Sequence, residues 1–225
     1  MKRIRELIEE KSFYNPYTND GIEIFDGKFN DIKSRIVCTC VNREYYKDIL
    51  DKVPHIDILD ISIVFEIEGY QDGTLEMKGI IGKEMLDLLK VSTEEMFAIA
   101  MKNTRLLRQT KVTTLYDVVK DLSPKDADIS VKSVYYISNK RGIKGAITIL
   151  YMEILMDLSN RLDSDLYLIP SSIHEFMVVS SSEYSVDDLR ATLHEANKKV
   201  VIDKEFLSNN IYLFDKKSKN IRIIY

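Results

Sequence analysis

The stretch Asp165–Ser182, "DLYLIPSSIHEFMVVSSS", has two apolar runs rich in β-forming residues on either side of the short centre "PSSIHE". Apolar runs of four to eight residues bounded by Pro and Ser predict strands joined by a turn. Pro170 ends the first strand, because proline has no backbone N–H to donate to a neighbouring strand. The stretch therefore predicts an antiparallel hairpin, since parallel strands need a much longer connection.

Other strand pairs follow the same pattern along the chain. "DILDISIVFEIEGY" and "LEMKGII" flank the turn "QDGT", and "NIYLFD" and "IRIIY" flank "KKSKN". "SVYYISN" leads through "KRG" into "IKGAITILY", which predicts either a hairpin or a strand leading to a helix. One long strand is predicted to have a single buried face, because every second residue is apolar: Ile61, Ile63, Phe65 and Ile67. We expect an α+β fold, with an antiparallel sheet built from sequential hairpins and helices packed on it.

Helical periodicity predicts the remaining elements. Apolar residues recur at helical spacing from Phe29 to Val41, and Ser92 with Glu95 forms a capping box before "TEEMFAIAMKNTRLL". Thr114 is a candidate cap for "LYDVVKDL". The best candidate boundary is "KDADIS" (125–130). We expect a helical N-terminal part with one β-hairpin (1–124) and an α+β C-terminal part (125–225), which together form one compact unit.

Composition narrows the classes of function. The chain has 225 residues, of which 45% are hydrophobic, and a formal net charge of −4. A general nucleic-acid binder normally has a basic face, so nucleic acid is not favoured as a partner. No apolar run is long enough for a membrane helix, and the charged start "MKRIRELIEEK" is not typical of a signal peptide. These features predict a cytoplasmic protein that does not bind membranes.

The polar centre of the opening stretch allows two interpretations. A nucleophilic site would pair Ser171 or Ser172 with His174, and Glu175 would orient the imidazole. However, adjacent residues of a strand point to opposite faces, and there is no Gly-x-Ser-x-Gly elbow. The alternative is a turn in which the hydroxyls bond local backbone groups and Ile173 packs into the core. The turn interpretation is favoured, and such a turn is still able to form part of a binding surface.

Three other patterns carry less information about chemistry. Cys38 and Cys40 are predicted on a helix, where residues two apart diverge by about 200° and do not converge on one ion. "VPHIDILD" (53–60) places His55 near two carboxylates, but it is also typical of a connection between helix and strand. "SNKRGIKG" (138–145) matches no phosphate-binding motif and is typical of a turn. We predict no metal site and no cofactor.

Several segments resemble one uncharacterised bacterial family. They are "FNDIKSRIVCTCVNREYYKDILDKVPHIDILDISIVFEI", "VSTEEMFAIAMKNTRLL", "VYYISNKRGIKGAITILY", "LDSDLYLIPSSIHEFMVV", "LRATLHEANKKVV" and "IYLFD". The family is a domain of unknown function found in anaerobic gut bacteria and their mobile elements. The resemblance covers residues 28–216, in matching order, and implies that most of the family's N-terminal region is missing. It also implies that Leu-Pro-Ser-Ser-x-His-Glu is a signature, so that Ser171, Ser172, His174 and Glu175 deserve the first tests.

These observations together favour a non-enzymatic module that binds a protein partner. An inhibitor encoded by a mobile element is one hypothesis within this class. The alternative is a hydrolase or transferase with a site around His174, Glu175 and Ser171 or Ser172, with His55 brought near by the fold. A homo-oligomer built by edge pairing of "IRIIY" is a further option. The candidate binding residues are Ser171, Ser172, His174, Glu175 and His55, and no residue is predicted to be catalytic.

Overall fold

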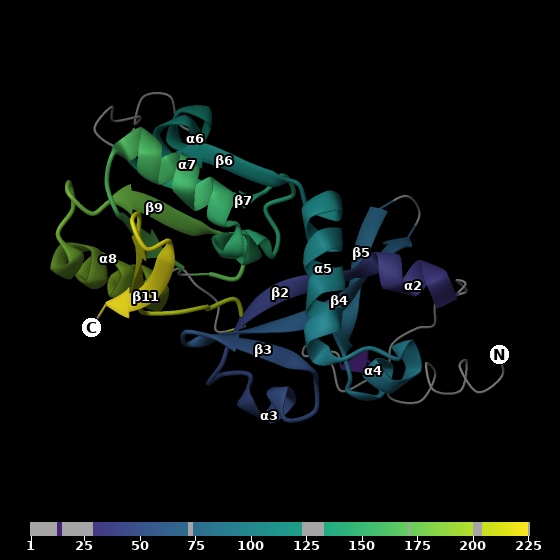
Figure 1. Cartoon of the computed structure of the whole chain (residues 1–225). Coiled ribbons are helices and arrows are strands. Elements are labelled where there is room, and N and C mark those ends of the chain that lie inside the picture. Colours follow the sequence, from purple (N-terminus) through teal and green to yellow (C-terminus); the bar gives the residue numbers. More distant parts are fainter. Residues whose placement is uncertain are drawn as a thin grey trace. The chain divides into compact units, whose positions relative to one another are not determined.

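The computed structural model describes residues 13–14, 29–71, 74–122, 133–170, 172–199 and 204–224. The chain forms two compact units, Met1–Gln109 (unit 1) and Thr110–Tyr225 (unit 2), each of which contains a sheet and helices (Figure 1). All described strand pairs are antiparallel, which confirms the predicted α+β class. The expected boundary at residues 124–125 lies outside the described residues.

Unit 1 has one sheet with the strand order β1-β5-β4-β2, and β3 also pairs with β4. The predicted hairpin is confirmed as β4 and β5, but the sheet has more strands than that single hairpin. The described elements, in chain order, are β1 (Phe13–Tyr14), α2 (Phe29–Arg35), β2 (Ile36–Asn42), α3 (Lys47–Leu50), β3 (His55–Ile58), β4 (Ile61–Gln71), β5 (Thr74–Ile81), α4 (Glu84–Leu89) and α5 (Thr93–Leu107).

The helix predicted from Phe29 to Val41 is wrong over its second half. Helix α2 ends at Arg35, and Ile36–Asn42 forms strand β2, which pairs with β4 from Ile36 opposite Ile67 onward. Every residue of β2 before Asn42 is buried. A strand buried on both faces is apolar at almost every position, so it matches helical spacing as well as a helix does. The β-branched and cysteine residues of "IVCTCVN" favour the strand.

The expectation of a single buried face on the long strand is also wrong. Residues 61–68 of β4 are all buried, including Glu66 and Glu68. Helix α5 lies against β2 in the same unit, as Figure 1 shows. The predicted capping box of α5 is confirmed, because Ser92 Oγ accepts from Glu95 N–H and Glu95 Oε2 accepts from Ser92 N–H.

Unit 2 has a six-stranded sheet with the order β11-β10-β8-β9-β7-β6. The hairpins β8–β9 and β10–β11 are confirmed, and β7 leads into helical turns, which was the second of the two alternatives for residues 133–151. The described elements are β6 (Thr110–Thr114), α6 (Leu115–Leu122), β7 (Tyr135–Asn139), the 3₁₀ helix η2 (Gly145–Leu150), α7 (Met152–Leu162), β8 (Leu166–Ile169), β9 (Phe176–Ser180), α8 (Val186–Lys199), β10 (Ile211–Asp215) and β11 (Asn220–Ile224).

Both faces of the unit 2 sheet are covered near its centre. On one face, Ile169, Val179 and Ile211 pack with Leu193 of α8 and with Leu115 at the start of α6. The residues that alternate with them on the strands are almost completely buried on the other face: Leu166, Leu168, Phe176, Val178, Tyr212 and Phe214. This arrangement explains why "LYLI", "FMVVS" and "IYLFD" are apolar runs and do not alternate with polar residues. The predicted cap of α6 is confirmed by the bond from Asp117 N–H to Thr114 Oγ1.

Across the part of the chain that the structure describes, no helix combines the length and the apolar character that spanning a bilayer would require.

Candidate functional site

The turn between β8 and β9 is fixed by backbone hydrogen bonds to two other segments of unit 2. Ile173 N–H donates to the Glu205 carbonyl at 2.8 Å, and Ser208 N–H donates to the Pro170 carbonyl at 3.1 Å. From a second segment, Ala146 N–H donates to the Ile173 carbonyl at 3.1 Å. The Ile173 side chain is buried, which confirms that it packs into the core. The turn is therefore part of a tightly bonded assembly of three loops.

The hydroxyl of Ser172 makes two local hydrogen bonds. Its Oγ accepts from His174 N–H at 2.9 Å and donates to Glu175 Oε1 at 2.8 Å. Ser172 is only 6% exposed, so this hydroxyl is not open to a substrate. The geometry is that of a serine turn in which the side chain replaces a backbone partner. Ser171 lies outside the described residues.

The two sides of the His174 imidazole have different partners. Lys144 N–H donates to Nδ1 at 3.1 Å, so Nδ1 holds a lone pair and the ring proton is on Nε2. Nε2 lies 3.3 Å from Glu205 Oε1, a suitable acceptor for that proton. The carbonyl of the same histidine accepts from Gly145 N–H at 2.8 Å and from the Ser138 hydroxyl at 2.7 Å. His174 thus links the β8–β9 turn to the start of η2 through both its backbone and its ring.

These bonds bear directly on the nucleophilic interpretation. A general base for a serine must offer a lone pair to the hydroxyl, and the lone pair of His174 already accepts the Lys144 N–H. The Ser172 hydroxyl donates to Glu175, not to the imidazole. The structure therefore brings Ser172, His174 and Glu175 together without arranging Ser172 and His174 as nucleophile and base.

Glu175 also affects Tyr136 on strand β7. Burial raises the pKa of the Tyr136 hydroxyl above its usual value of 10.0, and the negative charge of Glu175 and a hydrogen bond to it raise that pKa further. The phenol therefore stays protonated at physiological pH and donates to the carboxylate. Glu175 has two hydroxyl partners, Ser172 and Tyr136, which hold it in place at the start of β9.

The loop before η2 approaches the turn so closely that only glycine fits at position 145. A Cβ on Gly145 would lie 2.4 Å from Ser138 Oγ and 2.6 Å from both Asn139 N and the His174 carbonyl oxygen. Four backbone N–H groups of this loop donate to acceptors within the protein. Those of Arg141 and Gly142 donate to Asn139, and those of Lys144 and Gly145 donate to His174. These four N–H groups therefore hold the loop against the β8–β9 turn and its neighbour Asn139.

His55 lies in unit 1, on strand β3 and not in a connection as expected. Its Nδ1 lies 3.1 Å from the Val53 carbonyl, which accepts only, so Nδ1 carries a proton. Nε2 lies 3.9 Å from Asp57 Oδ1, which accepts from Ser62 Oγ at 2.5 Å and pairs with Arg43 Nε at 3.2 Å. His55 is thus part of a separate polar group within unit 1.

Unit 1 contains a buried ionic cluster that was not predicted from the sequence. Arg108, directly after α5, bonds Glu68 through Nε and lies 3.5 Å from Glu66 Oε2 through Nη2. Its Nη1 donates to Thr39 Oγ1 at 3.1 Å and to the Cys38 carbonyl at 3.0 Å, and the Thr39 hydroxyl donates to Glu66 at 2.9 Å. All three charged side chains are at most 4% exposed. Two glutamates within an apolar strand were the available signal, because buried carboxylates require partners.

Helix α5 and Arg108 also satisfy the outer edge of β2. Thr104 Oγ1 accepts from Cys38 N–H at 2.9 Å, Asn103 Nδ2 donates to the Ile36 carbonyl at 2.9 Å, and Arg108 binds the Cys38 carbonyl. The buried edge strand therefore has side-chain partners where a further strand would otherwise bond. This explains the polar residues on the sheet-facing side of the helix.

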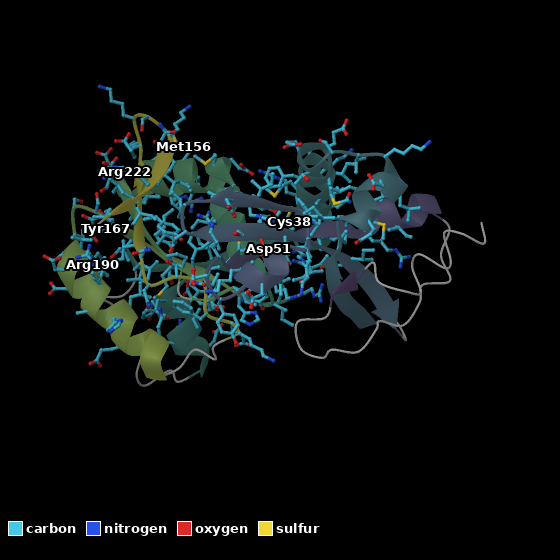
Figure 2. All side chains as sticks on the ribbon, turned by 90° about the horizontal axis from the view of Figure 1, so that it is seen from below. Cys38, Asp51, Met156, Tyr167, Arg190 and Arg222 are labelled. Atoms are coloured by element: carbon cyan, nitrogen blue, oxygen red, sulfur yellow. The ribbon has the colours of Figure 1, made fainter. Side chains whose placement is uncertain are left out.

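Cys38 and Cys40 lie on one face of strand β2, not on diverging positions of a helix. Both are free and buried, and Figure 2 labels Cys38 among the packed side chains of unit 1. Burial raises the pKa of the Cys38 thiol from 9.0 to about 12, against smaller opposing effects of Arg108 and Thr104. Burial likewise raises the pKa of Cys40. Neither thiol is therefore a ready nucleophile.

The described residues contain no group of three or more His, Cys, Asp or Glu side chains placed to hold a metal ion. A hollow of about 520 Å³ lies on unit 2, lined by Asp187, Arg190, Ala191, His194 and Asn209. Arg190 is labelled on α8 in Figure 2. Among the described residues, Ser172, His174, Glu175 and His55 do not line this hollow.

Comparison with known proteins identifies the family. The chain matches a family of unknown function, DUF5688, over residues 1–216, and it belongs to that family. The match starts earlier than the resemblance over residues 28–216 and ends at the same residue. No curated protein and no solved structure matches the chain.

Proposed function

We propose that this protein is a non-enzymatic module that binds another protein through the surface around the β8–β9 turn. The main support is the bonding of His174, whose ring and carbonyl join the turn to the segment that follows β7. A side chain used in this way stabilises backbone geometry and is poorly suited to proton transfer. In this proposal, His174 and Glu175 contribute their partly exposed atoms to recognition, and Ser172 shapes the turn.

The more specific parts of the proposal concern the setting. We place the protein in the bacterial cytoplasm and suggest a regulatory role, such as an inhibitor encoded by a mobile element. The two buried, free cysteines are compatible with a reducing compartment. The DUF5688 family has no known function, so both the partner and the regulatory role have to be established by experiment.

Affinity purification from producing cells, followed by mass spectrometry, tests the proposal. Wild type is compared with His174→Ala and with the control His194→Ala, which changes an exposed histidine of α8. We expect a specific partner that is retained by wild type and the control and lost by His174→Ala. The purified partner must then bind the purified wild-type chain directly. Partners that are unaffected by His174→Ala, together with a metabolite change in that variant alone, would favour the hydrolase or transferase alternative.

A further inference from the structure

The loop before η2 is bonded to His174 through two chemically different acceptors. Lys144 N–H donates to the imidazole Nδ1 at 3.1 Å, and Gly145 N–H donates to the His174 carbonyl at 2.8 Å. A carbonyl oxygen accepts a hydrogen bond at every pH, whereas an imidazole nitrogen accepts one only while it is unprotonated. The two neighbouring bonds are therefore expected to respond differently to acid.

Protonation of His174 removes the acceptor of the Lys144 N–H. The neutral ring carries its proton on Nε2, so a second proton, taken up from water, is bound at Nδ1. Two N–H groups would then point at each other across a distance that is now 3.1 Å, so either the ring or the backbone at Lys144 has to move. The His174 side chain is 22% exposed, so water is able to supply the proton.

The opposite side of the ring favours the charged form. Nε2 lies 3.3 Å from Glu205 Oε1, and this contact becomes a charge-assisted ion pair once the ring is protonated. The segments that contact His174 carry the following charged or titratable groups: Lys204 and Glu205 before β10, Lys140, Arg141 and Lys144 of the loop, Tyr136 of β7, and Glu175. Among the described residues, Glu205 is the one that pairs with the imidazole. Protonation thus replaces a neutral bond to Lys144 with an ion pair to Glu205.

The backbone at Lys144 is in a conformation that is disfavoured without this bond. Its φ is 52°, in the left-handed region that residues with a Cβ rarely adopt. Asn139 holds the other end of the loop, because its side chain accepts from Arg141 N–H and its carbonyl accepts from Gly142 N–H. Loss of the bond to His174 should therefore change the loop near Lys144 and leave the end held by Asn139 in place.

We infer that His174 is a pH-dependent switch, in which protonation at Nδ1 releases the Lys144 N–H and lets the backbone there leave its left-handed conformation. The switch acts within the chain and needs no partner. Its consequence for binding rests on the proposed function: acid would change the loop beside the recognition surface and weaken the binding of a partner.

NMR of the free protein between pH 8 and pH 5, the range in which histidine side chains change charge, tests the switch. Hydrogen-exchange protection of the Lys144 amide, corrected for the intrinsic exchange rate at each pH, is compared with that of the Gly145 amide as an internal reference. We expect the protection of Lys144 to fall by about fivefold or more as His174 gains its proton, and that of Gly145 to stay within about twofold.

Three substitutions separate the switch from a general effect of acid. His174→Asn offers an amide oxygen near the position of Nδ1 and gains no proton in this range, so the protection of Lys144 should not depend on pH. His194→Asn, on the exposed side of α8, is the matched control and should keep the wild-type response. Glu205→Gln removes the charge that favours the imidazolium, so the change should move to lower pH. Thermal unfolding of each variant verifies that the fold is intact.

Four results would overturn the switch: a ring that stays neutral across the range, protection of Lys144 that stays constant while the ring gains a proton, an equal fall at Gly145, or a wild-type response in His174→Asn. Each is measured on the free protein, so none depends on whether a partner exists. The proposed function fails separately, when affinity purification yields no specific partner.

Discussion

Two polar constellations, one in each unit, differ in burial and in what their side chains bind. In unit 1, Arg108 joins Glu66 and Glu68 in an almost completely buried ionic cluster. In unit 2, the side chains of Ser172 and His174 each bond one backbone N–H and lie beside one carboxylate, next to a partly exposed loop. Buried charges require partners, so the first cluster has a structural explanation on its own. The second fixes the backbone next to an exposed surface, where rigidity is useful for recognition.

The largest effect is expected from breaking the buried cluster. Arg108→Met removes the guanidinium that bonds both glutamates, so the free energy of unfolding should fall by about 3–5 kcal/mol. Chemical denaturation measures this, with Arg105→Met on the exposed side of α5 as the control. If Arg108→Met does not fold, Arg108→Lys, which keeps the charge without the fork, should fold with an intermediate loss. A loss below about 1 kcal/mol in Arg108→Met would contradict the structural role of the cluster.

The next effect concerns the contact between the loop and the turn in unit 2. Gly145→Ala introduces a Cβ within 2.4–2.6 Å of three atoms, and we expect a loss of about 1–3 kcal/mol. Gly142→Ala is the matched control, because a Cβ there has no atom within 4 Å and meets only the positive φ of 68°. Denaturant unfolding should rank Gly145→Ala as the more damaging change. The reverse order would show that the two loops are not packed as described.

A matched pair of hydroxyl deletions sharpens the comparison between the units. Thr104→Val leaves the Cys38 N–H without its acceptor in the interior of unit 1, and Ser172→Ala does the same to the His174 N–H near the surface. Each should lower the free energy of unfolding by about 1–3 kcal/mol. We expect Thr104→Val to be the more costly, because water is able to reach the exposed side of the turn. Equal losses in the free energy of unfolding would indicate that water reaches the turn no better than it reaches the core of unit 1.

The smallest effect at neutral pH concerns the thiols. Burial raises the pKa of Cys38 from 9.0 to about 12, so the folded state retains a proton that the unfolded chain releases. The resulting contribution to stability is complete below pH 9 and is lost as the pH rises from 9 towards 12. At pH 8, an aromatic disulfide reagent should react with neither cysteine until denaturant unfolds unit 1. Rapid reaction of the native protein would contradict the burial of both thiols.

The hairpins were predictable because the signals that specify them are local. Pro170 with two serines, and short polar turns between apolar runs, mark the strand ends wherever the remainder of the chain lies. The capping box of Ser92 and Glu95 is equally local. Strand β2 was missed because the covering of both its faces depends on distant elements. Its apolar run alone fits a helix as well as a strand.

The polar sites were predictable only in part, because some of their contacts are local in sequence and others join distant residues. Ser172, His174 and Glu175 were recognised as a group because they are adjacent in sequence. The partners of the His174 ring were not, since Lys144 and Glu205 are each about 30 positions away in opposite directions. The contacts of Arg108 span 40 to 70 positions. Only the fold brings such residues together.

The tautomer of His174 is the most direct test of the central claim, which is that this side chain fixes the backbone and does not act as a base. Nitrogen-15 NMR of the imidazole, assigned by comparison with His174→Gln, distinguishes the two ring nitrogens. We predict a proton on Nε2 and an unprotonated Nδ1 with the shift of a hydrogen-bond acceptor. A proton on Nδ1 with an unbonded Nε2 would contradict the claim and return the hydrolase or transferase alternative to first place.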